Sequence, residues 1–436
     1  MRLFEEYRQN LINNKQLYLK DYDVVIKKMN ESPAKYKGRP IDFLYQPFFV
    51  SQKDKKNFED LLDVLNGILN KVTEEYLRNK EFRKIFGFSD LLEKLILKDP
   101  GYKYNFPIGR FDIFYHLNGD FQFCELNTDG SSAMTEVREL QNAFENAQFV
   151  KDLSLEGHLK GFELFNSWVD CLTSNYHEFS MSKEKPNVAI VDWIDKEPPS
   201  EFIEFKKVFE KNGINTVIAD PRELVYKNNK LYFKDFRIDC IYRRLVTFEV
   251  VERADEIKDF INAYLNGDVC VVGGFRSQIP HNKKIFSILH NEKEISFLNE
   301  SERAFIEKHI PYTVEFDKNN SDLIEKAKKN KDLFVLKPVD KYASYGVKIG
   351  KDFTQNEWDD FINNVNDDYL LQKLCSIPKI DMAMFKNNEF VFEKNNYIIG
   401  LFVYNEKLNG VYVRTGRKNI IGSVAECFTI PAFIVE

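Results

Sequence analysis

The chain has 436 residues, of which 43% are hydrophobic and 30% are charged, and its formal net charge at pH 7 is −6. This composition excludes a mainly disordered chain, and the acidic balance argues against nucleic acid as the main partner, because a phosphate backbone requires a positive surface. No run approaches the ~20 apolar residues of a membrane span, and the charged start MRLFEEYRQNLINNK lacks the apolar core of a secretory signal. We therefore expect a cytoplasmic protein without a membrane partner, and a prior of about 150 residues per domain predicts about three structural units.

The first unit, residues 1–100, is charged and its patterning is helical. Between residues 58 and 76 apolar side chains recur at steps of three and four residues, which predicts one apolar stripe of an amphipathic helix. Core packing is the favoured interpretation of this stripe, and a helix that binds a partner is the alternative. The stripe consists of Phe58, Leu61, Leu62, Leu65, Ile68, Leu69, Val72 and Tyr76.

Residues 109–127 change to a period of two and contain Asn118-Gly119, a strong signal for a β-hairpin. If these two residues form a type I′ turn, Leu117 faces Asp120 and the facing pairs further along are fixed. Two such pairs are polar and project from the same face: Asp112 with Glu125, and Arg110 with Asn127. The opposite face is predicted to point to the core and carries Phe111, Ile113, Tyr115, Cys124 and Leu126.

Two carboxylates that face each other across strands repel, so their charge must be offset. A magnesium ion is one solution, because Asp, Glu and Asn supply hard oxygen ligands, and Arg110 beside it suits a phosphoryl oxygen. The alternative is a solvated ladder of ion pairs that involves Arg110 and the two acids. Asp112→Asn or Glu125→Gln is expected to keep the fold and remove activity, and in the metal-free protein the relief of the repulsion is expected to stabilise the fold.

The segment after the hairpin, residues 128–136, is a turn that leads into a helix, with a serine as a plausible N-cap. A helix N-terminus beside a cation site suits an anionic group such as a substrate carboxylate, and ordinary capping is the simpler interpretation. Residues 131–180 then return to a helical pattern. Residues 101–185 form the second predicted unit.

The third predicted unit, residues 186–275, alternates strands and helices. Strands at 187–193 and 215–220 flank a helix at 201–213, which predicts a small parallel α/β unit. It has no GxGxxG turn and is not interpreted as a dinucleotide site. The last unit, 276–436, is helical to about residue 330 and strand-rich from 333, with one helix at 355–365. The six cysteines form no CxxC pair and are expected to be buried free thiols; a catalytic thiol is the alternative.

Two lysines lie in contexts that suit phosphate binding: Lys337 ends the apolar strand LFVLKP, and Lys283 lies in HNKKIFSIL. With these segments added, the chain resembles the ATP-grasp part of the glutathionylspermidine synthetase family and related circularly permuted ATP-grasp proteins, from about residue 100 onward. The matching segments, in order, are GRFD (109–112), CELNTDGSS (124–132), IYRRL (241–245), NKKIFSIL (282–289), VLKP (335–338), YGVKIG (345–350), YLLQK (369–373) and GVYVRTG (410–416).

The resemblance implies a circularly permuted ATP-grasp fold with a small pre-ATP-grasp-like α/β unit and a helical N-terminal region. It also implies an ATP- and Mg²⁺-dependent ligase that joins a small-molecule or peptide carboxylate to an amine through an acyl-phosphate. Each predicted site residue takes its role from a matching motif position. Asp112, Glu125 and Asn127 match the magnesium ligands, Arg110 the catalytic arginine, Lys283 (or Lys284) and Lys337 the ADP-phosphate lysines, Gln372 the nucleotide hinge, and Ser131, Ser132 and Arg414 the substrate pocket.

The chain departs from the family in three places. The loop Lys341–Gly346 carries one glycine where the family usually has more, Lys373 follows Gln372 where many members have an acid, and no amidase domain fits in the remaining length. The glycine-poor loop favours a second hypothesis, a non-catalytic ATP-binding protein. A third is a small-molecule kinase, which would stop after phosphoryl transfer. The residues do not name the acid or the amine.

Overall fold

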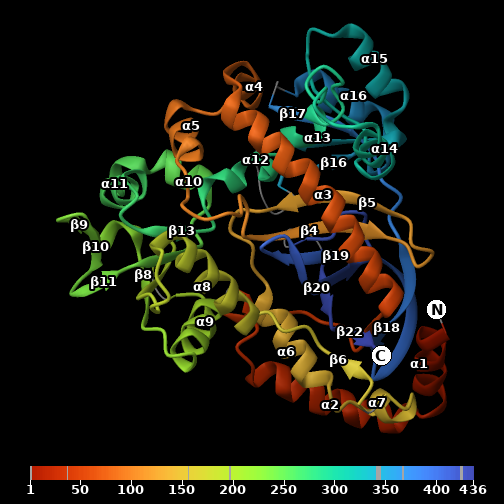
Figure 1. Ribbon diagram of the computed structural model, residues 1–436. Coiled ribbons are helices and arrows are strands. Elements are labelled where there is room, and N and C mark those ends of the chain that lie inside the picture. The colour runs from red at the N-terminus through yellow and green to blue at the C-terminus, as the bar shows by residue number, and fades with distance from the viewer. Residues whose placement is uncertain are drawn as a thin grey trace.

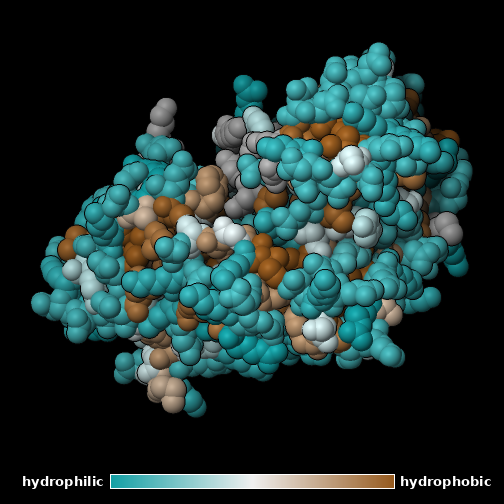
Figure 2. Space-filling view, turned by 90° about the horizontal axis from the view of Figure 1, so that it is seen from above, coloured by the Kyte–Doolittle hydropathy of each residue, from teal (hydrophilic) through white to brown (hydrophobic). Residues whose placement is uncertain are grey.

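The computed structural model describes residues 2–36, 38–155, 157–195, 198–339, 345–365, 368–422 and 426–436. It is a mixed α/β structure in which a central antiparallel sheet is flanked by a small parallel α/β unit, a second antiparallel sheet and a group of N-terminal helices (Figure 1). Among the described residues, none of the helices combines the length and apolar character needed to cross a bilayer. Figure 2 shows one face of the molecule, which is largely hydrophilic with hydrophobic residues gathered in small patches.

The central sheet has the strand order β21-β20-β19-β4-β5, and β18 pairs with the first half of the long strand β19. Its neighbouring strands are all antiparallel. The strand-rich pattern from residue 333 does not predict β18 as a separate strand, and β18 pairs only with residues 389–396 of β19. The strands are β4 (Ile108–Tyr115), β5 (Phe121–Asn127), β18 (Lys379–Lys386), β19 (Glu389–Tyr404), β20 (Lys407–Gly416) and β21 (Phe428–Ile430).

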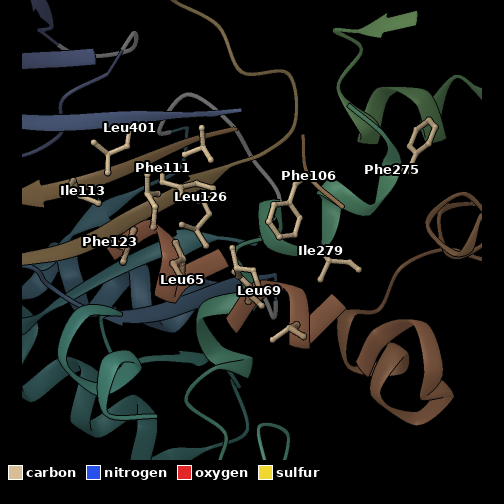
Figure 3. Packing of buried hydrophobic residues seen from close by; sticks show 14 of the residues in the cluster. Leu65, Leu69, Phe106, Phe111, Ile113, Phe123, Leu126, Phe275, Ile279 and Leu401 are labelled. Atoms are coloured by element: carbon tan, nitrogen blue, oxygen red, sulfur yellow. The ribbon is translucent and has the colours of Figure 1, made fainter. Parts of the chain in front are cut away.

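The long helix α3 (Gln52–Arg78) crosses one face of this sheet (Figure 1). It begins with a capping box, in which Ser51 and Asp54 bond to each other's backbone N–H groups. Every residue of the predicted apolar stripe is buried, so the core-packing interpretation is confirmed. Figure 3 shows Leu65 and Leu69 of this helix packed beneath Phe111 of the hairpin. The hairpin is therefore fixed from below by the helix.

The other N-terminal helices lie at both ends of α3: the two that precede it in the chain lie near its start, and the two that follow it lie near its end (Figure 1). Strand β3 (Phe48–Ser51) pairs in parallel with β22 (Ala432–Val435), so the purely helical prediction for residues 1–100 is wrong at this segment. Four residues carry too little pattern to predict a strand whose partner lies near the other end of the chain. The helices here are α1 (Arg2–Asn13), α2 (Lys15–Glu31), α4 (Lys80–Phe86) and α5 (Asp90–Leu97).

The small α/β unit contains a four-stranded parallel sheet in the order β13-β12-β7-β8, which confirms the predicted parallel arrangement. Helix α9 ends before Gly213, whose φ of 69° is the left-handed conformation typical of a helix C-terminus. A separate three-stranded antiparallel sheet, β9 to β11, extends from this unit. The main elements are β7 (Val188–Val191), β8 (Thr216–Ala219), β12 (Cys240–Arg243), β13 (Cys270–Val272), α8 (Asn166–Ser180), α9 (Ser200–Lys211), β9 (Leu224–Lys227), β10 (Lys230–Phe233) and β11 (Phe236–Ile238).

The last sheet has the order β14-β17-β15-β16 and packs against two helices around the buried Trp358. The indole Nε1 of Trp358 donates to the carbonyl oxygen of Ala327 at 3.0 Å, so its polar atom is satisfied inside the core. This sheet and the central sheet enclose the pocket described next. The elements are β14 (Thr313–Glu315), β15 (Phe334–Pro338), β16 (Lys348–Ile349), β17 (Tyr369–Lys373), α15 (Ser321–Lys329) and α16 (Gln355–Asn364).

Candidate functional site

The hairpin of β4 and β5 brings four polar residues to one face of the central sheet. Asp112 pairs with Glu125, and Arg110 pairs with Asn127. Side chains two residues apart on a strand share a face, so all four project together. This pairing is the one predicted from the sequence, whereas the chemical roles of the four residues stay a prediction.

The predicted two-residue turn, however, is wrong. The backbone N–H of Gly119 donates to His116 at 2.8 Å, and the N–H of His116 donates to Asp120 at 2.8 Å. Gly119 has a φ of 97°, and Asn118 Oδ1 accepts from the N–H of Asp120 at 3.0 Å. The connection is therefore a three-residue loop that ends on a left-handed glycine, and Leu117 does not face Asp120.

A β-bulge restores the register that the longer turn would have shifted. Beyond Asp112 the pairing moves by one residue, so that Ile113 faces Phe123 and Cys124 is the extra residue. Phe123 is fully buried in the core, while Cys124 lines the pocket. The predicted core position of Cys124 is wrong, because the inserted residue reverses the alternation of faces.

Asp112 is held by two arginines. Its Oδ1 accepts from Nε of Arg110 at 3.0 Å, its Oδ2 accepts from Nη2 of Arg414 at 2.6 Å, and its side chain is 3% exposed. Burial alone would lower the pKa of Arg414, but the charge of Asp112 raises it above the ordinary value. The repulsion between the facing acids is thus already offset by side chains. The expectation that the metal-free protein gains stability when Asp112 loses its charge does not suit this arrangement, because the arginines would lose their counter-charge.

Glu125 has a different counter-charge. Lys283 Nζ lies 3.0 Å from its Oε1. Burial would raise the pKa of Glu125, but Lys283 and, more weakly, Lys337 lower it to about 2. The carboxylate therefore stays ionised, with a partly exposed side chain that faces the pocket.

The pocket lies between the central sheet and the sheet of β14 to β17, and it measures about 740 Å³ out to its opening. One end is apolar and the other carries Glu125, Lys283 and Lys337, so it suits a ligand with a flat apolar part and an anionic part. The apolar lining comprises Phe114, Cys124, Val335, Val347, Ile349, Leu374, Cys375, Ile377, Ile398, Ile420 and Ile421.

The structure distinguishes the two adjacent lysines at the pocket. Lys283 lines it, whereas Lys284 points away and pairs with Glu315 at 3.0 Å. Lys337 also lines the pocket and donates to the carbonyl oxygen of Cys124 at 3.1 Å. Gln372 is a lining residue too, and its Nε2 donates to Thr313 Oγ1 at 2.8 Å. The predicted cofactor residues Lys283, Lys337 and Gln372 are therefore brought together.

The predicted serine cap is not formed. Helix α6 (Met134–Phe144) begins after Ala133, and the Ser131 hydroxyl donates instead to the carbonyl oxygen of Asn127 at 2.7 Å. The free N–H groups of Ala133 and Thr135 both donate to Oε2 of Glu201 at 3.1 Å. The helix N-terminus thus already holds an anion, which belongs to the protein itself.

One buried ion pair and the two hydrogen bonds to Glu201 fasten residues 128–135 to the α/β unit. Asp129 lies 2.8 Å from Arg243, and both side chains are almost fully buried. Glu201 lies 3.1 Å from Arg244. Because an unpaired charge inside a protein is costly, the pair of Asp129 and Arg243 fixes the segment beside the hairpin. Sequence reasoning missed Glu201 as a site residue. For Arg243 and Arg244, the only signal in the sequence was the pair of adjacent arginines in IYRRL.

Gly400 was also missed, although a glycine inside an apolar strand often marks a close approach. It lies in β19 between Asp112 of β4 and Tyr412 of β20. A Cβ at this position would lie 2.7 Å from Arg110 Cδ and 2.8 Å from Asp112 Oδ1. The absent side chain leaves the space across which Arg110 lies.

The donor set at the hairpin suits magnesium. Among the described residues, no three His, Cys, Asp or Glu side chains are grouped as a metal centre. Magnesium in nucleotide sites nevertheless needs only one or two carboxylates, with waters and phosphate oxygens as its other ligands. Asp112 and Glu125 are the two carboxylates of this set. Asn127 Nδ2 donates to Asp112 Oδ2 at 3.3 Å and to Glu125 Oε2 at 3.4 Å.

The glycine-poor loop lies mostly outside the described residues. Residues 340–344 are not described, so the prediction for Lys341 to Ser344 is untested by the structure. The six cysteines are free, as expected, but burial applies to four of them. Cys124 and Cys427 are partly exposed.

No protein-family model matches the sequence, and no curated protein matches it. Among solved structures, the chain is similar to a glutathione synthetase-like effector from Globodera pallida in its apo form, with a TM-score of 0.62, 11% identity and 97% coverage of both chains. Weaker likenesses are a protein assigned as a gamma-glutamylcysteine synthetase from Methylobacillus flagellatus (TM-score 0.41, 10% identity, 85% of this chain and 88% of that chain) and D-alanyl-alanine synthetase A from Vibrio cholerae (0.30, 9%, 57% and 88%). The chain thus shares its fold with the first protein, over nearly its whole length.

Proposed function

We propose that the chain is an ATP- and magnesium-dependent ligase that joins a carboxylate to an amine through an acyl-phosphate. The observation that carries this proposal is the arrangement of charges around one pocket. Lys283 and Lys337 line the pocket beside Glu125, and Glu125 faces Asp112 on the next strand, where Arg110 contacts the Asp112 carboxylate. The fold shared with a glutathione synthetase-like effector and the sequence resemblance to ATP-grasp ligases support it.

Each part of ATP has a place in this proposal. The apolar end of the pocket, with Gln372 at its edge, would take the base, and Lys283 and Lys337 would bind the phosphates. Asp112, Glu125 and Asn127 would hold Mg²⁺, which when bound neutralises phosphate charge and polarises the γ-phosphoryl group. Asp112, which contacts Arg110 and Arg414, would be available to such an ion once these arginines bound phosphoryl oxygens instead.

The reaction needs positioning and charge more than a nucleophilic side chain. A substrate carboxylate oxygen attacks the γ-phosphorus and ADP leaves. The amine nitrogen then attacks the acyl carbon, loses a proton, and expels phosphate. Arg110 offsets charge on the transferring group, and Ser131, Ser132 and Arg414 would border the acid substrate. Arg110 Nη1 donates to the carbonyl oxygen of Ser132 at 3.0 Å, and this contact supports the proposed role of that segment.

The test is ADP release from ATP and Mg²⁺ with a panel of amino acids, short peptides and polyamines as acids and amines. Release that requires one acid and one amine supports the ligase. Hydroxylamine added with the acid alone should trap a hydroxamate if an acyl-phosphate forms. ATP binding without turnover for every pair would contradict the proposal and favour a non-catalytic nucleotide-binding protein.

A further inference from the structure

The two arginines beside Asp112 share a second contact. Arg110 and Arg414 lie diagonally on either side of the cross-strand row that runs from Asp112 through Gly400 to Tyr412. Their guanidinium carbons lie 5.3 Å and 5.4 Å from the centre of the Tyr412 ring. Both distances fall within the range of cation–π attraction. The same aromatic ring therefore contacts both guanidinium groups, on the strand next to Gly400.

Tyr412 is itself fixed by a carboxylate. Its hydroxyl donates to Oε2 of Glu136 at 2.6 Å, and Thr429 Oγ1 lies 3.4 Å from the same oxygen. Only 7% of Tyr412 is exposed. Burial, and to a lesser degree the charge of Glu136, raises the pKa of Tyr412 well above its ordinary value, so the phenol keeps the proton that this hydrogen bond requires. The first turn of α6 is thereby connected to the arginine pair.

We propose that Tyr412, anchored by Glu136, is a positioning residue that holds Arg110 and Arg414 as a paired seat for a phosphoryl or carboxylate oxyanion. Two adjacent guanidinium groups repel each other, and Asp112 can offset that repulsion only while its carboxylate does not bind a metal ion. Tyr412 supplies a support that remains when Asp112 turns to a metal ion. This role rests on the proposed function, because the oxyanion it serves is the group transferred from ATP.

The experiment uses the full chain and two simple probes, inorganic phosphate for the arginine seat and adenosine for the apolar end of the pocket. Tyr412→Leu removes the ring and should raise the Kd for phosphate about tenfold, as the loss of two cation–π contacts implies. Tyr412→Phe keeps the ring but loses its anchor, and should raise it about threefold. Both should leave the Kd for adenosine unchanged. Isothermal titration calorimetry measures both values.

The matched control is Tyr404→Phe. Tyr404 is equally buried on the neighbouring strand, and its hydroxyl donates to a backbone carbonyl, that of Leu164, at 3.1 Å. The Tyr404→Phe variant should bind phosphate as tightly as the parent does. Combining Tyr412→Leu with Arg110→Ala should raise the Kd for phosphate by less than the product of the two single effects, because both substitutions act on the same binding site. If Tyr412→Leu fails to fold, Tyr412→Phe and its control decide the question.

The inference is overturned if the parent does not bind phosphate, if both Tyr412 variants bind it as tightly as the parent, or if phosphate and adenosine affinities fall together. The last result would show a merely structural role. The proposed function fails separately, when the parent releases no ADP with any acid and amine. Weaker phosphate binding in the variants, with adenosine binding intact, supports the arginine seat in either case.

Discussion

Buried acids behave in opposite ways at the hairpin and at the end of the parallel sheet. At the hairpin, Lys283 lowers the pKa of Glu125 to about 2 despite burial. At the end of β7, burial raises the pKa of Asp192 to about 6, and Arg244 lowers it only in part. Burial acts in the same direction at both sites, so the difference comes from the distance and number of cations. The cations around the hairpin thus keep the Glu125 carboxylate ionised, as the binding of a cation requires.

The largest effect is expected at Glu125. Glu125→Gln keeps the shape of the side chain but removes the charge that Lys283 faces and that a metal ion would use. We expect ADP release to fall at least about 100-fold, a size typical of losing one main electrostatic contact in a catalytic site. Steady-state kinetics with saturating ATP and Mg²⁺ measure it. Glu389→Gln, which alters an exposed pair with Lys15, is the control and should keep full activity. Equal turnover in Glu125→Gln and the parent would remove Glu125 from the mechanism.

Asp112→Asn tests the other acid of the hairpin through stability. The substitution leaves Arg110 and Arg414, each with a side chain 13% exposed, without their common counter-charge. We expect the free energy of unfolding to fall by about 3 kcal/mol, measured by urea titration without metal. Asp381→Asn, which breaks an exposed pair with Arg8, should cost less than about 1 kcal/mol. A stability gain in Asp112→Asn would instead show that repulsion from Glu125 dominates.

Asp192→Asn tests the opposite case. Because the pKa of Asp192 in the folded protein (about 6) lies above its ordinary value of 3.8, the folded state binds the proton more tightly. The parent therefore loses stability as pH rises from about 4 to about 6. The amide variant does not, so it should be more stable than the parent by about 3 kcal/mol at pH 8 and equal to it at pH 3. Urea titrations at both pH values measure this, and the exposed Asp195→Asn should change stability by less than about 0.5 kcal/mol at either. A gain of the same size at pH 3 would rule out titration as the cause.

The smallest effect concerns the turn that sets the hairpin's register. Gly119 has a φ of 97°, and a Cβ there would make only an ordinary contact of 3.7 Å with Asn57. Gly119→Ala should therefore lower the free energy of unfolding by about 1 kcal/mol through backbone strain alone. Gly67 lies in the middle of α3, and a Cβ there would meet no atom within 4 Å. Gly67→Ala should instead raise the free energy of unfolding by about 0.5 kcal/mol. Thermal unfolding compares the two, and equal shifts would contradict the three-residue turn.

The sequence predicted the two polar facing pairs of the hairpin correctly, although it missed two features and the pairs nearer the turn. The turn is one residue longer than predicted, and the bulge at Cys124 inserts one residue in β5, so the two offsets cancel. Asn118-Gly119 fits either loop length. The bulge depends on Phe123 entering the core beneath β5, which local patterning does not show.

Other parts of the site were beyond local patterns for the same reason. The choice between Lys283 and Lys284 depends on which side of a short helix meets β5. The cap of α6 comes from Glu201, whose helix lies in another unit. Gly400 and Tyr412 come to lie in one row with Asp112 only because β19 pairs with both β4 and β20.

The sequence by itself determined the polar face of the hairpin and the alternation of strands and helices in the small α/β unit, because these depend mainly on spacing along the chain. Tertiary structure alone decided which charge neutralises which. Arg414 reaches Asp112, and Lys283 reaches Glu125, from segments more than a hundred residues away. Ion pairing depends on distance in space and on burial, and neither is set until the sheets have packed together.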